Sequence, residues 1–180
     1  MTTTPELWDD LEVLRTQLEE RLLGLRGSWI SRQSHYEGDC ANALGGTLAA
    51  STYWDCTLGS GMKIELKKTR NGGMWFDLVR YSKVILDPEL AADVVTMILR
   101  YKLLPIPAVT HIAVILHDDL LKALRLDEEK ARAILNLERE LPRALNAQAR
   151  LSWSDLTAAA RFVVGSNSRT GPFRKLRTSS

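Results

Sequence analysis

Three residues in the middle of the chain have the types and spacing of a hydrolytic metal site. Asp55 precedes Glu65 by ten positions, and Lys67 follows Glu65 by two. Residues two apart on a β-strand point to the same face, so the Glu65 and Lys67 side chains are expected to leave a strand together. Two carboxylates beside an ammonium can hold a divalent cation and stabilise negative charge that develops on a substrate.

The turn between the two acids decides whether they meet. Residues 52–58 and 62–67 have the composition of two strands, and Gly59-Ser60-Gly61 that of a turn. A three-residue loop places Asp55 opposite Glu65, with Cβ atoms roughly 4.5–5.5 Å apart, where like charges repel. Mg²⁺ suits such a pair because it takes hard oxygen ligands, often from only one or two carboxylates. A two-residue loop would instead send the acids to opposite faces.

Hydrolysis of a phosphodiester is the reaction that this set predicts. Bound Mg²⁺ lowers the pKa of its water and polarises a phosphoryl oxygen. Lys67 can position the attacking water and stabilise the charge that develops on phosphorus. An acid and a lysine two apart are also common on a solvated edge strand, so the prediction depends on Asp55 and on the turn.

The spacing of these residues resembles a known motif. Asp55, nine intervening residues and Glu65-Leu66-Lys67 are similar to the active-site motif of the PD-(D/E)XK nucleases, and most like small type II restriction endonucleases of the PvuII kind. Trp54 stands where the motif's name has proline. In that family a polar loop, a helix and an apolar core strand follow the motif. Here they are expected at residues 69–73, 88–103 and 109–116.

The resemblance implies a type II restriction endonuclease, a homodimer that cleaves duplex DNA with Mg²⁺, for which Mn²⁺ can substitute. It implies an α/β fold with a mixed central β-sheet flanked by helices, restriction-endonuclease-like. We expect a single nuclease domain over residues 1–165. Within it, residues 1–50 form the N-terminal helical part and residues 51–116 the catalytic core. A basic tail follows at residues 166–180. Asp55 and Glu65 are the expected metal ligands. Glu37 is either an additional acid near the metal or a solvated helix residue.

Basic and amide side chains outside the motif are candidates for DNA binding. Arg70 and Asn71 follow the catalytic lysine in a Gly-rich loop, and their side chains have the chemistry to read guanine and adenine edges. A plain turn is an equally good interpretation of this loop. Lys68 is either a phosphate contact or a surface residue, and Lys83 is a weaker candidate of the same kind as Arg70 and Asn71. Phosphate contacts are expected from Arg174 and Lys175 in the basic tail.

Hydrophobic periodicity predicts the surrounding elements. Apolar residues at helical spacing indicate a helix over residues 5–26, whose acidic face favours packing or dimerisation over DNA contact. Residues 127–141 form a second strong helix and the other candidate for a dimer seam. Further expectations are a strand over 74–81, a helix over 88–103, a buried strand over 109–116 and an element of undecided type over 150–164.

Composition limits the classes of function. Hydrophobic residues make up 45% of the chain and charged residues 26%, as in ordinary globular proteins, and the net charge is +2. No apolar run is long enough to cross a bilayer and no secretory signal is evident, so a cytoplasmic protein without a membrane partner is expected. Cys40 and Cys56 are too few for a disulfide framework or a zinc set.

Two other functions remain open from the sequence. One is a Holliday-junction resolvase or a DNA-repair nuclease of the same superfamily, which would need DNA shape rather than base contacts. The other is a non-catalytic helical interaction module in which Asp55, Glu65 and Lys67 are surface charges.

Overall fold

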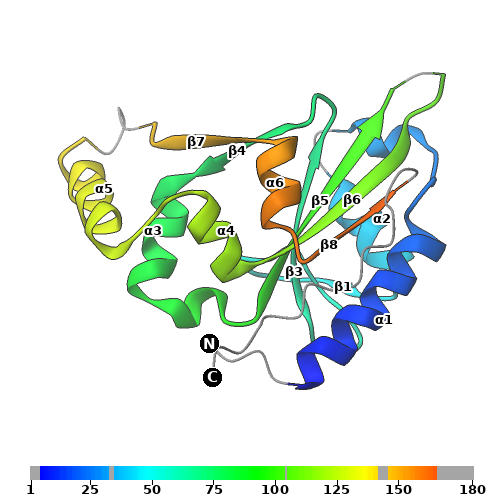
Figure 1. Ribbon diagram of the computed structural model, residues 1–180, viewed down its shortest axis with the longest axis horizontal. Coiled ribbons are helices and arrows are strands. Elements are labelled where there is room, and N and C mark those ends of the chain that lie inside the picture. Colours follow the sequence, from blue (N-terminus) through cyan, green and yellow to red (C-terminus); the bar gives the residue numbers. More distant parts are fainter. Residues whose placement is uncertain (1–4, 33–34, 104, 142–145, 166–180) are drawn as a thin grey trace.

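The protein is a mixed α/β structure with a mixed central sheet flanked by helices (Figure 1). The computed structural model describes residues 5–32, 35–103, 105–141 and 146–165. Six strands form the central sheet in the order β1-β2-β3-β5-β6-β8, and β4 pairs with β7 in a separate ribbon. The strands are β1 Thr47–Leu48, β2 Cys56–Thr57, β3 Lys63–Thr69, β4 Gly73–Asp77, β5 Val94–Lys102, β6 Ala108–Leu116, β7 Gln148–Ser152 and β8 Phe162–Gly165.

One strand pair sets the topology. β3 and β5 are parallel, whereas every other neighbouring pair in the described part of the sheet is antiparallel. Parallel neighbours need a crossover connection, and α3 provides it. The helices are α1 Pro5–Arg21, α2 Tyr36–Ala43, α3 Leu78–Leu86, α4 His117–Ala123, α5 Glu128–Glu140 and α6 Trp153–Ala159, with 3₁₀ turns at Ser28–Ser31 and Pro88–Ala91.

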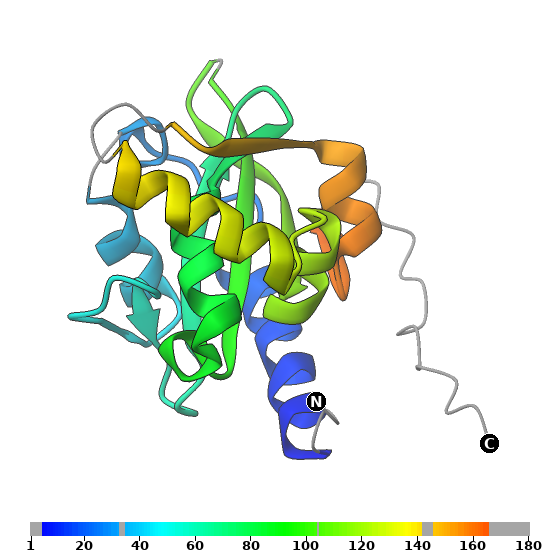
Figure 2. The ribbon, with the colours of Figure 1, turned by 90° about the vertical axis from the view of Figure 1, so that its left-hand side faces the viewer.

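Two apolar layers cover the two faces of the central sheet. On one face, α1 and α2 pack against β3, β5 and β6, with buried leucines of α1 and of the residue after it: Leu11, Leu14, Leu18 and Leu22. On the other face, Ile98 and Ile115 of the sheet pack with residues of the β4–β7 ribbon and of α3, α4 and α6. α5 packs against the outer side of α3 (Figure 2). The sheet is therefore buried on both faces.

The helix expected over residues 88–103 is wrong. A 3₁₀ turn at Pro88–Ala91 leads into the strand β5, whose first six residues are all buried. Leu90, Val94, Met97, Ile98 and Tyr101 do recur at helical spacing, but a strand covered on both faces also reads as a continuous apolar run, so periodicity alone does not separate the two. β-branched Val94, Val95 and Thr96 favour the strand.

The strand expected over residues 74–81 is wrong in its second half. β4 ends at Asp77, whose carboxylate accepts hydrogen bonds from the backbone N–H groups of Val79 and Arg80. This side-chain cap starts α3 at Leu78. The crossover helix therefore lies about ten residues earlier in the chain than expected, and β5 takes the place of the apolar strand that follows it.

The other expected elements agree with the structure wholly or in part. The strand over 109–116 and the helix over 127–141 are confirmed as β6 and α5. The N-terminal helix ends earlier, at Arg21, and the first strand of the motif hairpin is reduced to Cys56–Thr57. The undecided segment 150–164 contains the end of β7, α6 and most of β8. Within the described ranges no helix is long and apolar enough to cross a membrane.

Candidate active site

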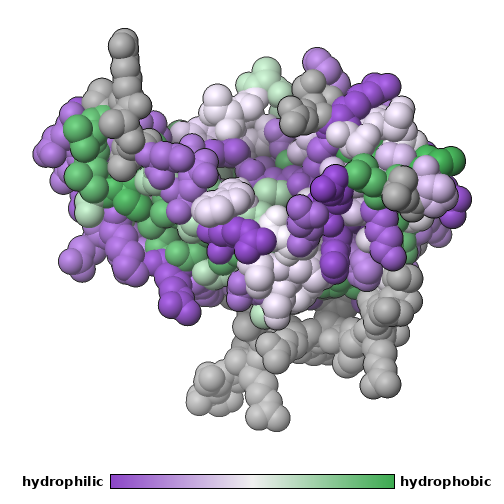
Figure 3. All heavy atoms as spheres, turned by 90° about the horizontal axis from the view of Figure 1, so that it is seen from above, coloured by the Kyte–Doolittle hydropathy of each residue, from purple (hydrophilic) through white to green (hydrophobic). Residues whose placement is uncertain are grey.

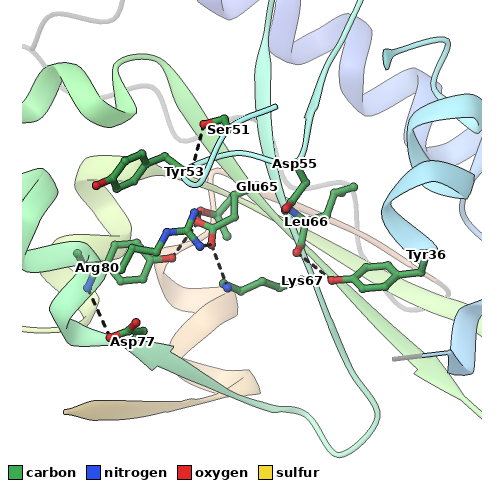
Figure 4. Close-up of polar contacts among 11 residues, drawn as sticks. Tyr36, Ser51, Tyr53, Asp55, Glu65, Leu66, Lys67, Asp77 and Arg80 are labelled. Atoms are coloured by element: carbon green, nitrogen blue, oxygen red, sulfur yellow. Dashed lines mark hydrogen bonds and ion pairs between the residues drawn. The ribbon is translucent and has the colours of Figure 1, made fainter. Parts of the chain in front are cut away.

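The β2–β3 hairpin brings Asp55 beside the Glu-Leu-Lys strand. The register pairs Cys56 with Ile64, and the Leu58 N–H donates to the Met62 carbonyl at 2.9 Å, so the predicted three-residue loop is confirmed. Gly61 ends this loop with φ of 89°, a conformation that favours glycine. The ladder ends at Cys56, and the Asp55 N–H donates to the Ile64 carbonyl at 2.8 Å, which keeps Asp55 beside the motif strand. The Leu66 N–H donates to Asp55 Oδ2 at 2.6 Å and fixes the carboxylate against β3 (Figure 4).

Glu65 lies at the centre of a buried polar cluster. Its side chain is only 3% exposed, and Oε1 lies 2.9 Å from Lys67 Nζ and 2.8 Å from Arg80 Nη1. Oε2 accepts hydrogen bonds from the Tyr81 hydroxyl at 2.9 Å and the Thr96 hydroxyl at 3.4 Å. A buried carboxylate is stable only when it is paired and hydrogen-bonded in this way.

Arg80 and Tyr81 are site residues that the sequence did not reveal. Both lie in the first turn of α3 and reach Glu65 from the helix side, as Figure 4 shows for Arg80. Their signal was hidden because the segment was expected to be a strand. Recognition of Asp77 as a helix N-cap would have put Arg80 and Tyr81 on a crossover helix that follows the motif strand.

His117 lies at the far side of the Tyr81 ring. The two rings stack with centroids 6.0 Å apart. Burial lowers the pKa of His117, although the negative charges of Glu65 and Asp118 act in the opposite direction. Both ring nitrogens are buried and lack a hydrogen-bond partner among the described residues. His117 thus belongs to the surroundings of the cluster and is a neutral ring at neutral pH.

The electrostatics at Asp55 favour a cation. Burial raises the pKa of Asp55, and the neighbouring charges of Glu65 and Glu37 raise it further, whereas the Leu66 N–H and Lys67 lower it. The ionised carboxylate is thus held in a site where negative charge is not fully compensated. A divalent cation at this position would stabilise the ionised form.

The available carboxylates suit Mg²⁺ rather than a metal ion that takes all its ligands from protein side chains. Over the described ranges, no three His, Cys, Asp or Glu residues are grouped closely enough to hold a metal. Mg²⁺ commonly binds through one or two carboxylates, with water and substrate phosphate as the remaining ligands. Asp55 and Glu65 can supply those two carboxylates. A cation there would share Glu65 Oε1 with Lys67 and Arg80 or displace one of them.

Glu37 lies on α2 and influences the motif only through its charge. It contributes to the raised pKa of Asp55, and no hydrogen bond or ion pair joins the two. The neighbouring Tyr36 makes the direct contact, donating its hydroxyl to the Leu66 carbonyl at 3.0 Å (Figure 4). Glu37 therefore acts on Asp55 through its charge, and Tyr36 contacts the motif backbone.

The residues expected to bind DNA occupy different environments. Lys68 points to the face opposite Lys67, donates to the Ile30 carbonyl at 2.9 Å and lies 4.3 Å from the centroid of the Tyr36 ring. Burial lowers the pKa of Lys68. Lys83 lies on α3 and pairs with Glu138 of α5 at 3.5 Å. Arg70 and Asn71 are exposed between β3 and β4. Arg174 and Lys175 lie outside the described residues.

Comparison with known proteins adds no relative. The chain matches no protein-family model, and no curated protein is similar to it in sequence. What this site can do therefore has to be argued from its own geometry.

Proposed function

We propose that this protein is a Mg²⁺-dependent endodeoxyribonuclease of the PD-(D/E)XK type. One observation carries the proposal: Asp55 is bonded to the motif strand beside Glu65, and Lys67 lies 2.9 Å from the Glu65 carboxylate. Two acids and a lysine from a three-residue hairpin thus converge as the proposed chemistry requires.

The order of elements around the motif supports the same class. The motif strand β3 is followed by a polar loop, the strand β4, the helix α3 and the apolar strand β5, which is parallel to β3. A loop, a helix and a core strand follow the motif in the proposed family. In this chain the loop lies where it was expected, whereas the helix and the strand next to the motif strand lie earlier than expected. A restriction-endonuclease-like fold is therefore part of the proposal.

Each residue of the cluster has a proposed role. Asp55 and Glu65 would hold the metal, which when bound activates water and polarises a phosphoryl oxygen. Lys67 would position the attacking water and stabilise charge on phosphorus. Arg80 orients the Glu65 carboxylate through its ion pair with Oε1, and Tyr81 and Thr96 fix the second oxygen. Burial at Glu65 strengthens these electrostatic interactions.

Duplex DNA cut at a specific sequence is the proposed substrate, and a homodimer the proposed assembly. One chain supplies one Asp-Glu-Lys set, so cutting both strands calls for two copies, and a two-fold dimer matches a palindromic site. The leucine stripe of α1 is buried within its own subunit. Leu137 of α5 is 45% exposed and Leu141, which follows the helix, is 51% exposed, and a green strip lies on this side of the molecule in Figure 3. Of the two candidate dimer seams, α1 and α5, we therefore propose α5.

A structural ion cluster is the second candidate, and one observation favours it. Both Glu65 oxygens already have partners within the protein, as in a buried charge that serves stability alone. The two candidates differ in their response to metal. A nuclease gains thermal stability with Mg²⁺ in proportion to binding and loses that gain in Asp55→Asn, whereas a structural cluster shows no Mg²⁺ effect in either protein.

Incubation of plasmid DNA with Mg²⁺ tests the proposed activity directly. Discrete fragments would support a restriction endonuclease, and cleavage confined to branched DNA would favour a junction resolvase or repair nuclease. Absence of any cleavage with Mg²⁺ or Mn²⁺ across linear, supercoiled and branched substrates would refute the proposal.

A further inference from the structure

A second group of charged residues lies on the same face of the central sheet as the Glu65 cluster. Strand register pairs Lys67 with Ile98, Thr69 with Arg100, and Arg100 with His111. Paired residues in neighbouring strands point to the same face. Arg100 and His111 therefore lie one row beyond Lys67, toward the end of β3 at which the loop with Arg70 begins.

Arg100 is held by stacking rather than by an acid. Its guanidinium carbon lies 5.3 Å from the centroid of the Trp153 ring, and His111 meets the same ring edge-on at 6.1 Å. Gly72 lies close to both residues: a Cβ there would come within 3.3 Å of Trp153 Cβ and 3.6 Å of Arg100 Nη2. Stacking occupies the faces of a guanidinium and leaves its in-plane N–H donors available to a planar or tetrahedral anion.

A second guanidinium lies against the next residue of the chain. Arg150 on β7 packs on Gly73 so closely that a Cβ at Gly73 would overlap it. Its strand partner is Trp75, which is 58% exposed, and Arg150 itself is exposed. Two arginines from different strands thus flank the consecutive glycines Gly72 and Gly73.

Neither arginine is neutralised. In the described part of the chain, no carboxylate lies within ion-pair distance of Arg100 or Arg150, while Lys102 adds a further positive charge that acts on His111. This side of the molecule faces the viewer in Figure 3, where hydrophilic residues gather over its middle. Uncompensated guanidinium groups with free donors are the usual protein partner of phosphate.

We propose that Arg100 and Arg150, together with the Gly72-Gly73 backbone, form a phosphate-binding site separate from the Asp55–Glu65–Lys67 cluster. The absence of side chains on the two glycines lets both guanidinium groups approach the loop. Trp153 orients Arg100 by stacking, and the phosphate would bridge the two arginines.

The position of the site suggests which phosphate it takes, a step that rests on the proposed nuclease function. Two residues along a strand cover about 6.6 Å, and neighbouring strands lie about 4.8 Å apart, so the Lys67 and Arg100 backbones are roughly 8 Å apart. A separation of this size suits a backbone phosphate of the same DNA strand that neighbours the one at Lys67.

Binding of a labelled duplex of random sequence, measured by anisotropy over a salt series without divalent cation, tests the site. Arg100→Gln and Arg150→Gln should each weaken binding about ten-fold, as expected for one charge-assisted contact. Each should also reduce the slope of log affinity against log salt by about 0.9. Lys122→Gln on α4, which removes a 78% exposed ammonium, is the matched control and should change neither.

One further variant and the exposure of Arg150 separate charge from folding. Arg100→Lys retains the charge and should restore the salt slope but not the full affinity, because lysine cannot stack or bind in bidentate fashion. Arg150 is exposed, so Arg150→Gln reports on the site even where Arg100→Gln unfolds. Unchanged affinity and slope in a folded Arg150→Gln protein, or losses equal to those of Lys122→Gln, would overturn the site.

The result is separable from the fate of the nuclease proposal. If wild-type protein binds no duplex, inorganic phosphate is titrated while the His111 ring is followed by NMR. Burial, Arg100 and Lys102 lower the pKa of His111, so bound phosphate should raise it in wild type but not in Arg100→Gln. That outcome would retain an anion site for free phosphate compounds and reject nucleic acid. No response to either ligand would reject the site.

Discussion

Glu65 on β3 and Arg80 on α3 form an ion pair of 2.8 Å that ties the candidate catalytic strand to the crossover helix. Because Arg80 is 27% and Glu65 3% exposed, the pair is largely shielded from solvent. The same carboxylate oxygen contacts Lys67, so strand, helix and proposed catalytic lysine are joined at one atom.

Glu65→Ala should destabilise the protein. The change leaves Lys67 and Arg80 without a counter-charge and the Tyr81 hydroxyl without its acceptor, and loss of one partner of a buried pair costs about 3 kcal/mol. Glu65→Gln retains an acceptor for Tyr81 and should lose less. Urea unfolding of both variants measures the difference. Equal stability of wild type and Glu65→Ala would show that the cluster contributes nothing to the fold.

Asp55→Asn should have the opposite effect on stability at neutral pH. The pKa of Asp55 is raised in the folded state, so folding disfavours the ionised carboxylate. Asn retains an oxygen that accepts from the Leu66 N–H and carries no charge. We expect a higher Tm than wild type at pH 7. The advantage should shrink as pH falls through the folded-state pKa and vanish below about 3.8, where the acid is protonated in both states.

Mg²⁺ should reverse the order of the two melting temperatures, so that wild type melts above Asp55→Asn. A cation that binds wild type but not Asp55→Asn stabilises only the former. Thermal melts with and without Mg²⁺ at pH 7 measure the shift, and EDTA serves as the control. If the Tm of Asp55→Asn exceeds that of wild type by the same amount in saturating Mg²⁺ as without metal, the result would argue against Asp55 as a ligand.

Lys67→Met should reduce cleavage by about 10²–10³-fold while the protein still binds DNA, because the proposed role of Lys67 lies in the chemical step. Lys122→Met on α4 removes a 78% exposed ammonium and is the matched control. Single-turnover cleavage and anisotropy separate the two effects. If binding falls as far as cleavage, Lys67 is a phosphate contact rather than a catalytic residue.

Arg80→Met should lower both stability and cleavage, because it removes the ion pair that orients the Glu65 carboxylate. Arg80→Lys should recover part of each, since the positive charge is retained and the planar fork is lost. The ratio of kcat to KM effects shows whether Arg80 positions Glu65 or contacts substrate. A change in KM alone would assign it to substrate binding.

The α5 seam makes a prediction about assembly. Leu137→Arg should convert a dimer to a monomer in light scattering, because the charge would be buried in the proposed apolar seam. Val13→Arg on α1, where the side chain is 57% exposed, is the control and should leave the dimer intact. A monomer for wild type, both free and bound to DNA, would rule out the dimer and favour a nicking or repair enzyme.

The sequence predicted the local geometry of the site better than the elements around it. Gly59-Ser60-Gly61 was enough to set the hairpin register that brings Asp55 beside β3, because turn length fixes strand pairing. β5 was misassigned because its fully buried residues carry no alternation to distinguish strand from helix. That error also displaced α3 and hid Arg80 and Tyr81. Thr96 reaches Glu65 only through the parallel pairing of β3 with β5, which is a tertiary contact.

Cleavage of supercoiled plasmid by wild type, Glu65→Gln and Lys67→Met, with Mg²⁺ and with EDTA, tests the central claim most directly. The proposed nuclease cuts only as wild type and only with Mg²⁺, and both variants are inactive although circular dichroism shows them folded. Cleavage by folded Glu65→Gln at the wild-type rate, or wild-type cleavage that persists in EDTA, would contradict it.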